Sequence, residues 1–193
     1  MTTLHPLPLA ACLLSGALAL CAALPAPATP AAPAATPRDG AHDFDFNIGT
    51  WKTHIRRPTD PFAKNPQFVE LNGTVTVRKI WDGRGQVEEI EADGPRGHWE
   101  GLTLFLYNPA ARQWTQTFAD STDGVLTTPL IGEFHDGRGE LYAQESFRGR
   151  TLLIRGTWSD IRPDSHHFQE DFSADGGRTW VPAFIGELTR LAP

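Results

Sequence analysis

Apolar and polar residues alternate along most of this chain in short segments, a pattern typical of strands with one buried face. In the segment 67–81, the positions of one face carry Val69, Leu71, Val75, Val77 and Trp81. No window sustains the i, i+3, i+4, i+7 repeat of an amphipathic helix. The pattern therefore predicts a domain that consists almost entirely of β-strands.

Short turn sequences separate these segments and predict that neighbouring strands pair. Asp82–Gly85 and Asp136–Gly139 share the sequence Asp-Gly-Arg-Gly, and Asp-Gly supplies the positive φ values that tight hairpins need. Residues 107–111 and 148–150 predict two more turns. Counting the segments gives about ten strands. We therefore expect an all-β fold, an antiparallel up-and-down meander barrel, whose closure removes the edges of the sheet.

The first strand is expected over residues 46–57, with a glycine and a tryptophan near its start. Phe46 and Trp51 fall on opposite parities, so alternation survives only if Gly49 introduces a bulge or a kink. Such a kink would turn Trp51 across one end of the barrel as a plug. The alternative is an ordinary strand with a core tryptophan.

The connection after this strand is a long loop with three prolines, Pro58, Pro61 and Pro66. Phe62 lies in its middle, where a polar residue would be usual. We expect Phe62 either to cover the mouth of the barrel as a lid or to pack on a neighbouring hairpin.

The N-terminal part of the chain differs in composition from the rest. The first 37 residues contain no Lys, Arg, Asp or Glu, and Leu7–Leu24 is an Ala- and Leu-rich run of the length of an export signal. We expect a signal peptide over residues 1–24, a disordered Pro- and Ala-rich linker over 25–41 and the barrel domain over 42–193. The protein would then be exported, to the periplasm or out of the cell.

Lipid attachment is the route by which we would expect contact with a membrane. Cys12 follows residue types of a lipoprotein cleavage box, but few residues precede it, and Cys21 follows a bulky leucine. The protein would be lipid-anchored only if Cys12 or Cys21 is modified. Because both cysteines fall in the expected leader, we expect no disulfide in the domain.

Charge argues against two classes of partner. The net charge is −6 and no basic patch is visible, so we expect no nucleic-acid partner and no attraction to anionic membranes. We interpret the acidic residues Glu88, Glu89 and Glu91 as a solvated edge, with a surface that tolerates calcium as the alternative. His166 and His167 point to opposite faces of a strand and cannot jointly chelate one ion, so we expect no metal site.

The last hairpin contains the sequence Ser-Ala-Asp-Gly-Gly-Arg-Thr-Trp at residues 173–180, which resembles the Asp box of sialidase-like propellers. In that turn the aspartate accepts hydrogen bonds from the backbone, and the tryptophan packs under the loop. Propellers repeat the box once per blade, so a single copy argues against that fold. We interpret Asp175 and Trp180 as parts of a structural turn.

A second resemblance involves both ends of the domain. Gly49-Thr50-Trp51 resembles the Gly-x-Trp signature of lipocalins and their calycin relatives, in which a basic residue of the last strand packs over the tryptophan. Arg190 stands in the matching place. With Phe-Asp-Phe at 44–46 and Asp-Gly-Gly-x-Thr-Trp at 175–180, the chain is similar to a family of uncharacterised exported bacterial barrels. This resemblance implies a calycin-like fold and no established reaction.

Haem is a minor alternative, suggested by nitrobindin-like barrels of the calycin group, which bind haem through a histidine near the C-terminus. His166 and His167 are the histidines in that region, and neither lies in a matching motif. We therefore expect no cofactor.

Alternation in the later strands predicts which side chains point into the barrel. The same parity places Trp180 and Arg190 on one inward face. The polar residues on the inward faces could also mark the rims of the barrel, and Glu170 could pair with Arg190. An inward polar group must be paired or face a wet cavity. The candidate cavity residues are Trp114, Gln116, Glu145, His166, Phe168, Glu170 and Phe184.

We expect a non-catalytic protein that binds a small apolar or amphipathic molecule inside the barrel. The sequence contains no nucleophile elbow, zinc-protease motif or phosphate loop. Two alternatives remain open. One is an enzyme of the cyclase or isomerase type that uses Glu145 and His166 for proton transfer. The other is a cell-envelope scaffold whose barrel is filled by its own side chains.

Overall fold

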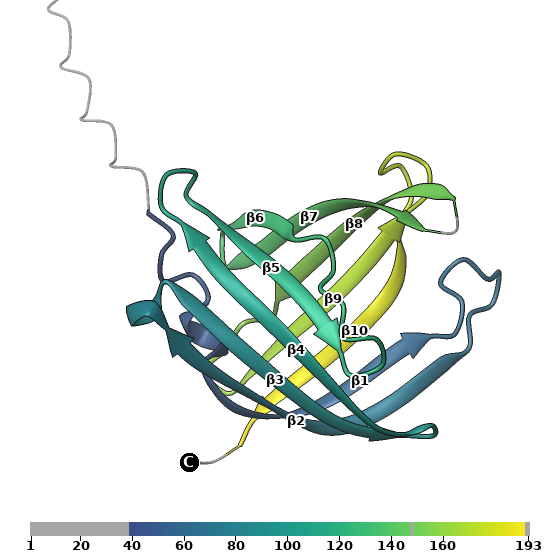
Figure 1. The fold of residues 1–193 in the computed structure, drawn as a ribbon, viewed down its shortest axis with the longest axis horizontal. Helices are drawn as coiled ribbons and strands as arrows, with labels where there is room; N and C mark the ends of the chain where they lie inside the picture. The colour runs from purple at the N-terminus through teal and green to yellow at the C-terminus, as the bar shows by residue number, and fades with distance from the viewer. Residues whose placement is uncertain (1–38, 148, 192–193) are drawn as a thin grey trace, which may run out of the picture. The chain divides into compact units, whose positions relative to one another are not determined.

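The computed structural model describes residues 39–147 and 149–191, and these form a closed antiparallel barrel of ten strands (Figure 1). The strands follow one another around the barrel in chain order, and β1 closes it by pairing with both β2 and β10. The predicted meander is confirmed. The strands are β1 Gly49–Pro58, β2 Phe68–Ile80, β3 Gly85–Gly94, β4 Gly97–Asn108, β5 Gln113–Asp120, β6 Leu130–His135, β7 Arg138–Phe147, β8 Arg150–Ser159, β9 Ser165–Ser173 and β10 Val181–Arg190.

The expected signal peptide and nearly all of the expected linker lie outside the described residues, which begin at Asp39. Within the described part, we find no helix with the length and apolar character needed to span a membrane. Export and lipid attachment therefore stay predictions.

A short turn, and not a strand, precedes β1. Asp45–Asn47 form a 3₁₀ turn, η1, and β1 begins at Gly49, whose φ of +127° strongly favours glycine. The prediction of a strand from residue 46 is therefore wrong at its start. The physical reason is that the chain leaves the sheet here so that Phe44 can fill one end of the barrel, where it is fully buried.

Phe44 is the centre of an aromatic cluster that fills this end of the barrel, which we call the closed end. Edge-to-face and tilted ring contacts of this kind add stability beyond the area that they bury. Ring centroids 4.7 to 5.5 Å from that of Phe44 belong to Phe105, Trp114, Phe134 and Trp158.

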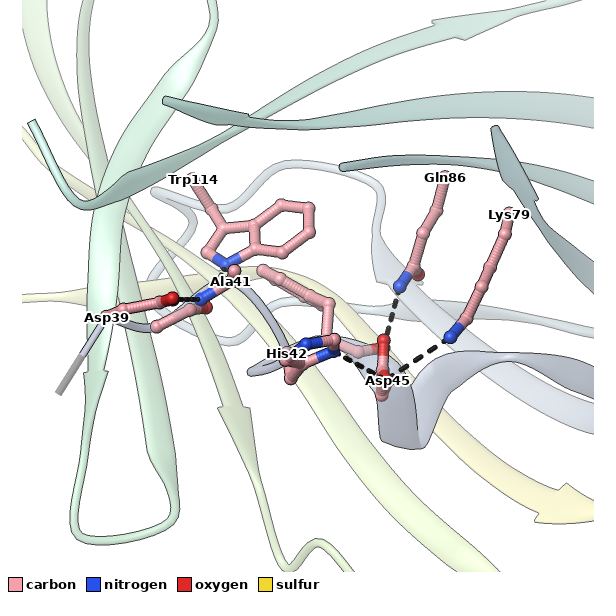
Figure 2. A network of polar contacts seen from close by, with 9 residues as sticks. Asp39, Ala41, His42, Asp45, Lys79, Gln86 and Trp114 are labelled. Atoms are coloured by element: carbon pink, nitrogen blue, oxygen red, sulfur yellow. Dashed lines mark hydrogen bonds and ion pairs between the residues drawn. The ribbon is translucent and has the colours of Figure 1, made fainter. Parts of the chain in front are cut away.

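Polar contacts hold the N-terminal segment against the closed end (Figure 2). Trp114 donates its indole N–H to the carbonyl of Gly40 at 2.9 Å, and Gln86 donates to the carbonyl of Phe44 at 3.0 Å. Trp114 and Gln86 are both buried, so these bonds satisfy polar groups that are cut off from solvent. Gly40, which we expected in the linker, thus contacts the barrel.

Arg190, the last residue of β10, joins the two ends of the domain. It lies opposite Trp51 in the β1–β10 ladder, with its guanidinium carbon 3.9 Å from the centroid of the indole. The contact expected from the Gly-x-Trp resemblance is present. Gly49 is required beside it, since a Cβ there would lie 2.5 Å from an Arg190 nitrogen. The guanidinium also donates to the carbonyls of Phe46, Ile48 and Pro163.

Two tryptophans lie outside the barrel although alternation placed them inside. Trp81 is 61% exposed, because it sits in the turn between β2 and β3 with a φ of +51°. Trp180 precedes β10 and lies on the outer surface, its ring centroid 4.5 Å from the guanidinium carbon of Arg155. A bulge near the start of β10 shifts the parity, so Trp180 does not share a face with Arg190.

Trp51→Ala is expected to reduce the free energy of unfolding by roughly 3–5 kcal/mol, the range for removing a large buried aromatic side chain. The change also removes the surface on which Arg190 stacks. Urea unfolding followed by circular dichroism measures the loss. Trp81→Ala is the matched control, because the exposed Trp81 should contribute about 0.5 kcal/mol or less. Equal losses in the two variants would contradict the structural role of Trp51.

Candidate functional site

A cavity of about 520 Å³ lies inside the barrel. It extends from Glu88 and Trp158, next to the closed end, to the loops 59–67 and 121–129 at the opposite end, which we call the mouth. Each of the ten described strands contributes at least one lining residue. The cavity is therefore the interior of the barrel itself, and its size falls in the range of small-molecule sites, roughly 300–1,000 Å³.

Aromatic and aliphatic side chains form most of the cavity wall. Phe168 lies 4.7 Å from Trp158 and 6.0 Å from Phe184 between ring centroids, so these rings form a continuous face across β8, β9 and β10. Trp158 donates its indole N–H to Gln116 at 2.9 Å, which satisfies the polar part of the indole. The aromatic lining residues are Phe118, Phe147, Trp158, Phe168, Phe172 and Phe184.

The side chain of Glu88 on β3 is buried at the inner end of the cavity. Its carboxylate accepts hydrogen bonds from Thr103 at 2.7 Å and from Asn47 at 3.2 Å. Burial raises the pKa of Glu88, and these hydrogen bonds oppose the rise. The prediction of a solvated acidic edge is therefore wrong for this residue. Alternation along β3 turns Glu88 inward and leaves Glu89 and Glu91 exposed.

Glu170 on β9 faces the cavity between Gly156 of β8 and Phe184 of β10, its neighbours in the ladder. Its carboxylate forms no hydrogen bond or ion pair with any residue that the structure describes. Burial raises the pKa of Glu170 to about 7, the negative charge of Glu145 adds to the rise, and Arg57 opposes it. This carboxyl group therefore gains and loses its proton near neutral pH.

Glu145 on β7 lies at the mouth and contacts the loop 121–129. Its carboxylate accepts a hydrogen bond from the backbone N–H of Thr128 at 3.0 Å. β5 and β6 pair over three residue pairs, and beyond these pairs the loop 121–129 forms the wall of the barrel. It lines the cavity with Asp123, Thr127 and Thr128.

Arg57 at the end of β1 is the basic residue among the described residues that line the cavity. Its guanidinium carbon lies 5.5 Å from the ring centroid of Trp99 and 6.0 Å from that of Phe184. Asp120 accepts a hydrogen bond from Trp99 at 3.3 Å. Burial alone would raise the pKa of Asp120, but hydrogen bonds and the charge of Arg57 outweigh it and lower that pKa. Asp120 thus offsets the charge of Arg57.

His166 is buried at the closed end and does not line the cavity. Its ring centroid lies 4.3 Å from that of Trp51 and 5.1 Å from that of Phe46. Neither ring nitrogen has a hydrogen-bond partner among the described residues. Burial and, to a smaller extent, the positive charge of Arg190 lower the pKa of His166 to about 3, so the ring is neutral at physiological pH.

The structure brings together five of the seven candidate cavity residues. Trp114 and His166 stay outside, because both pack among the rings of the closed end. Glu145 and His166, considered as a proton-transfer pair, therefore lie at opposite ends of the barrel. The five residues that line the cavity are Gln116, Glu145, Phe168, Glu170 and Phe184.

Sequence reasoning missed several polar residues of the cavity. For Glu88 and Thr103 the signal was present, because they alternate with exposed residues along β3 and β4. Thr128 carried no such signal, since it lies in a loop. The alternative that Glu170 pairs with Arg190 is wrong, because Arg190 donates to backbone carbonyls at the closed end and forms no ion pair with Glu170. Within residues 39–147 and 149–191, no three His, Cys, Asp or Glu side chains gather as a metal site.

The turn 173–180 stabilises itself and does not line the cavity. The carboxylate of Asp175 accepts hydrogen bonds from the hydroxyl of Ser173 and from the backbone N–H groups of Arg178 and Thr179. The bond from the backbone of Thr179 is the largest of the effects that lower the pKa of Asp175 to about 2. Trp180 donates its indole N–H to the carbonyl of Gly177 at 3.0 Å. We therefore assign a structural role to this turn.

Phe62, the lid candidate, lies at the rim of the mouth. Its ring stacks on that of Phe172 with centroids 6.5 Å apart, and Phe172 in turn lines the cavity. The preceding residue, Pro61, also lines the cavity. Phe62 itself is 39% exposed. The loop 59–67 thus forms one side of the mouth, and both roles considered for Phe62 use this contact.

A family model matches residues 37–178, and its description is "Protein of unknown function (DUF1579)". The chain belongs to this family. The match includes β1 to β9 of the DUF1579 barrel, and hence most of the cavity wall. No curated protein is significantly similar to the chain.

Solved structures with a similar fold include an S-type phycobiliprotein lyase, CPES, from Guillardia theta. Its TM-score is 0.54 with 13% sequence identity, over 78% of this chain and 91% of that chain. A de novo designed fluorescence-activating β-barrel gives 0.42 with 17% identity, over 80% and 99% of the two chains. EF1p2_mFAP2b bound to DFHBI gives 0.44 with 9% identity, over 79% and 99%. At these identities the similarity shows the fold alone. It rests on the lyase, whose TM-score is above 0.5.

His166→Phe is expected to make the DUF1579 barrel less sensitive to acid. An unfolded histidine takes up a proton near pH 6.5, whereas folded His166 does so near pH 3, so the contribution of His166 to stability is lost as the pH drops from 6.5 toward 3. Phenylalanine keeps the ring contacts and lacks this loss, so the change in unfolding free energy from pH 7 to pH 5 should be about 1–2 kcal/mol more favourable in the variant than in the parent, measured by urea unfolding. His135→Phe, at an exposed position, should leave the loss unchanged. A His166→Phe variant as acid-sensitive as the parent would contradict the neutral buried ring.

Proposed function

We propose that this protein binds a small, largely apolar or amphipathic molecule inside its barrel and catalyses no reaction on it. The observation that carries the proposal is the cavity of about 520 Å³, lined from all ten described strands. Protein interiors are normally packed to high density, and aromatic rings fill the closed end of this barrel. An interior that serves stability alone would extend that packing to the mouth. The open volume favours ligand binding over the role of a filled scaffold.

The composition of the wall supports the same function. Binding sites for small molecules combine a mainly apolar surface with a few polar groups that orient the ligand. Here six aromatic rings form the apolar part, and Gln116, Glu145 and Glu170 are among the polar groups. The ligand would bury its apolar body against the rings and direct its polar atoms toward these side chains.

The arrangement of titratable groups favours binding over catalysis. General acid–base catalysis needs groups within hydrogen-bond reach of the reacting atoms. Glu145 lines the cavity at the mouth, whereas His166 is enclosed by rings at the closed end. The pair considered for a cyclase or isomerase thus has no common site on which to act.

We infer the location and the fold group of this binding protein from its N-terminal sequence and from the contact of Arg190 with Trp51. The uncharged, Ala- and Leu-rich N-terminus supports export, with a lipid anchor only if Cys12 or Cys21 is modified. The stacking of Arg190 over Trp51 supports a place among the calycin-like barrels. An exported carrier or binding protein fits both inferences.

Native mass spectrometry of the protein purified from its own cells tests the proposal. We expect a mass in excess of the chain that disappears when the protein is denatured. A protein that carries no extra mass and binds no apolar probe added in solution would contradict the proposal.

Gly186→Leu is expected to abolish most of this binding while the barrel stays folded. Gly186 on β10 lines the cavity, and a Cβ there would meet no atom closer than 3.4 Å, so a leucine can extend into the open volume. We expect roughly tenfold weaker binding or more. Thr189→Leu, which adds a leucine to the outer face of the same strand, is the matched control and should bind normally. Equal binding by the two variants would show that the ligand lies elsewhere.

Phe62→Ala is expected to speed ligand exchange by about two- to tenfold with little change in Tm, if the loop 59–67 covers the mouth. Stopped-flow displacement of a fluorescent probe measures the rate. Phe68→Ala is the control, because Phe68 has the same exposure, 39%, and does not line the cavity. A large drop in Tm with unchanged exchange would assign Phe62 a packing role on Phe172 instead.

A further inference from the structure

The charged side chains that face the cavity are mostly acidic. Arg57 is the basic residue among the described residues that line it, and the neighbouring Asp120 offsets its charge. An enclosed surface with excess negative charge attracts positive ligands and disfavours negative ones. The acidic lining residues are Glu88, Asp120, Asp123, Glu145 and Glu170.

Glu170 differs from the other four carboxylates. Each of those accepts a hydrogen bond from a neighbouring side chain or backbone N–H. Glu170 accepts none from the residues that the structure describes, although the barrel wall encloses it and it faces the cavity. A carboxylate that faces a cavity and receives no donor from the protein can accept hydrogen bonds from a bound molecule. The cavity therefore offers a partner to a positively charged or hydrogen-donating ligand.

The immediate surroundings of Glu170 also suit an organic cation. Phe168 and Phe172 lie two residues to either side of it on β9, and Phe184 is its neighbour on β10. All three rings line the cavity. Aromatic faces attract cations, most strongly where water is excluded.

We propose that the ligand is an amphipathic organic cation, with its ammonium or amidinium group beside Glu170 and its apolar body against the aromatic wall. The inference deepens the proposed function and rests on it. A fatty acid or another anion would bring its charge near Glu145 and Glu170 and is disfavoured. An inorganic cation would leave the aromatic rings unused, and the described residues form no cluster of metal ligands.

Three probes with the same aromatic body test the charge preference: 1-naphthylmethylamine, 1-naphthalenemethanol and 1-naphthoate. Isothermal titration calorimetry or naphthalene fluorescence gives each Kd at pH 8. We expect the amine to bind about tenfold tighter than the alcohol, and the carboxylate more weakly than the alcohol. An alcohol or carboxylate that binds as tightly as the amine would overturn the inference.

Glu170→Gln assigns the preference to one side chain. Glutamine keeps the size and removes the charge, so the amine should lose about tenfold in affinity while the alcohol changes by about twofold or less. Glu187→Gln, the same exchange on the outer face of β10, should change neither value. A preference for the amine that persists in Glu170→Gln would also overturn the assignment.

A pH profile of the parent protein gives a measurement that needs no variant. The other charged groups that line the cavity are Glu88, Asp120, Asp123, Glu145 and Arg57. Arg155, Asp171 and Glu187 point outward from β8, β9 and β10, and the charge of Asp171 also raises the pKa of Glu170. Because the pKa of Glu170 is about 7, affinity for the amine should rise roughly tenfold from pH 6 to pH 8. Affinity for the alcohol should stay constant. A flat profile for the amine would contradict the pairing.

The outcomes separate the two proposals. If none of the three probes binds and no mass co-purifies with the native protein, the proposed binding function itself fails. If the alcohol binds and the amine shows no advantage, small-molecule binding stands and the cationic ligand is wrong.

Discussion

The contact of Arg190 with Trp51 is the constraint on which the rest of this structure depends. A barrel closes only if its first and last strands meet in one register, and here the last residue of β10 lies on the indole of β1. The same guanidinium holds the carbonyls of Phe46 and Ile48. The turn η1 is thereby fixed, so that the carbonyl of Asn47 accepts the indole N–H of Trp51. The aromatic packing of the closed end follows from this arrangement.

Two glutamates in the barrel interior, one near each end, differ in the hydrogen bonds that they accept. Near the closed end, Glu88 receives donors from two neighbouring elements, and its burial is compensated within the protein. Toward the mouth, Glu170 is enclosed by the wall but receives no donor from the described residues. The contrast separates a structural carboxylate from one that is available to a ligand.

Two buried titratable groups make stability depend on pH in opposite directions. The raised pKa of Glu170, about 7 against an ordinary 4.5, means that its contribution is present at low pH and is lost as the pH rises through 7. The lowered pKa of His166, about 3 against 6.5, means that its contribution is lost as the pH falls below 6.5. Between pH 4.5 and 6.5 the two effects oppose each other, which favours a broad optimum in mildly acidic solution.

Local spacing in the sequence determined the strand content, the hairpins and the antiparallel meander, because alternation and Asp-Gly turns depend on residues close in the chain. It also determined that Glu145, Phe168 and Glu170 point inward, since their strands are regular. Tertiary structure decided the rest. The turn η1, the outward Trp180 and the enclosed His166 depend on a kink, a bulge and ring contacts between segments far apart in sequence. Whether an inward carboxylate finds a donor is likewise set by distant segments, so Glu88 and Glu170 could be told apart only in the folded barrel.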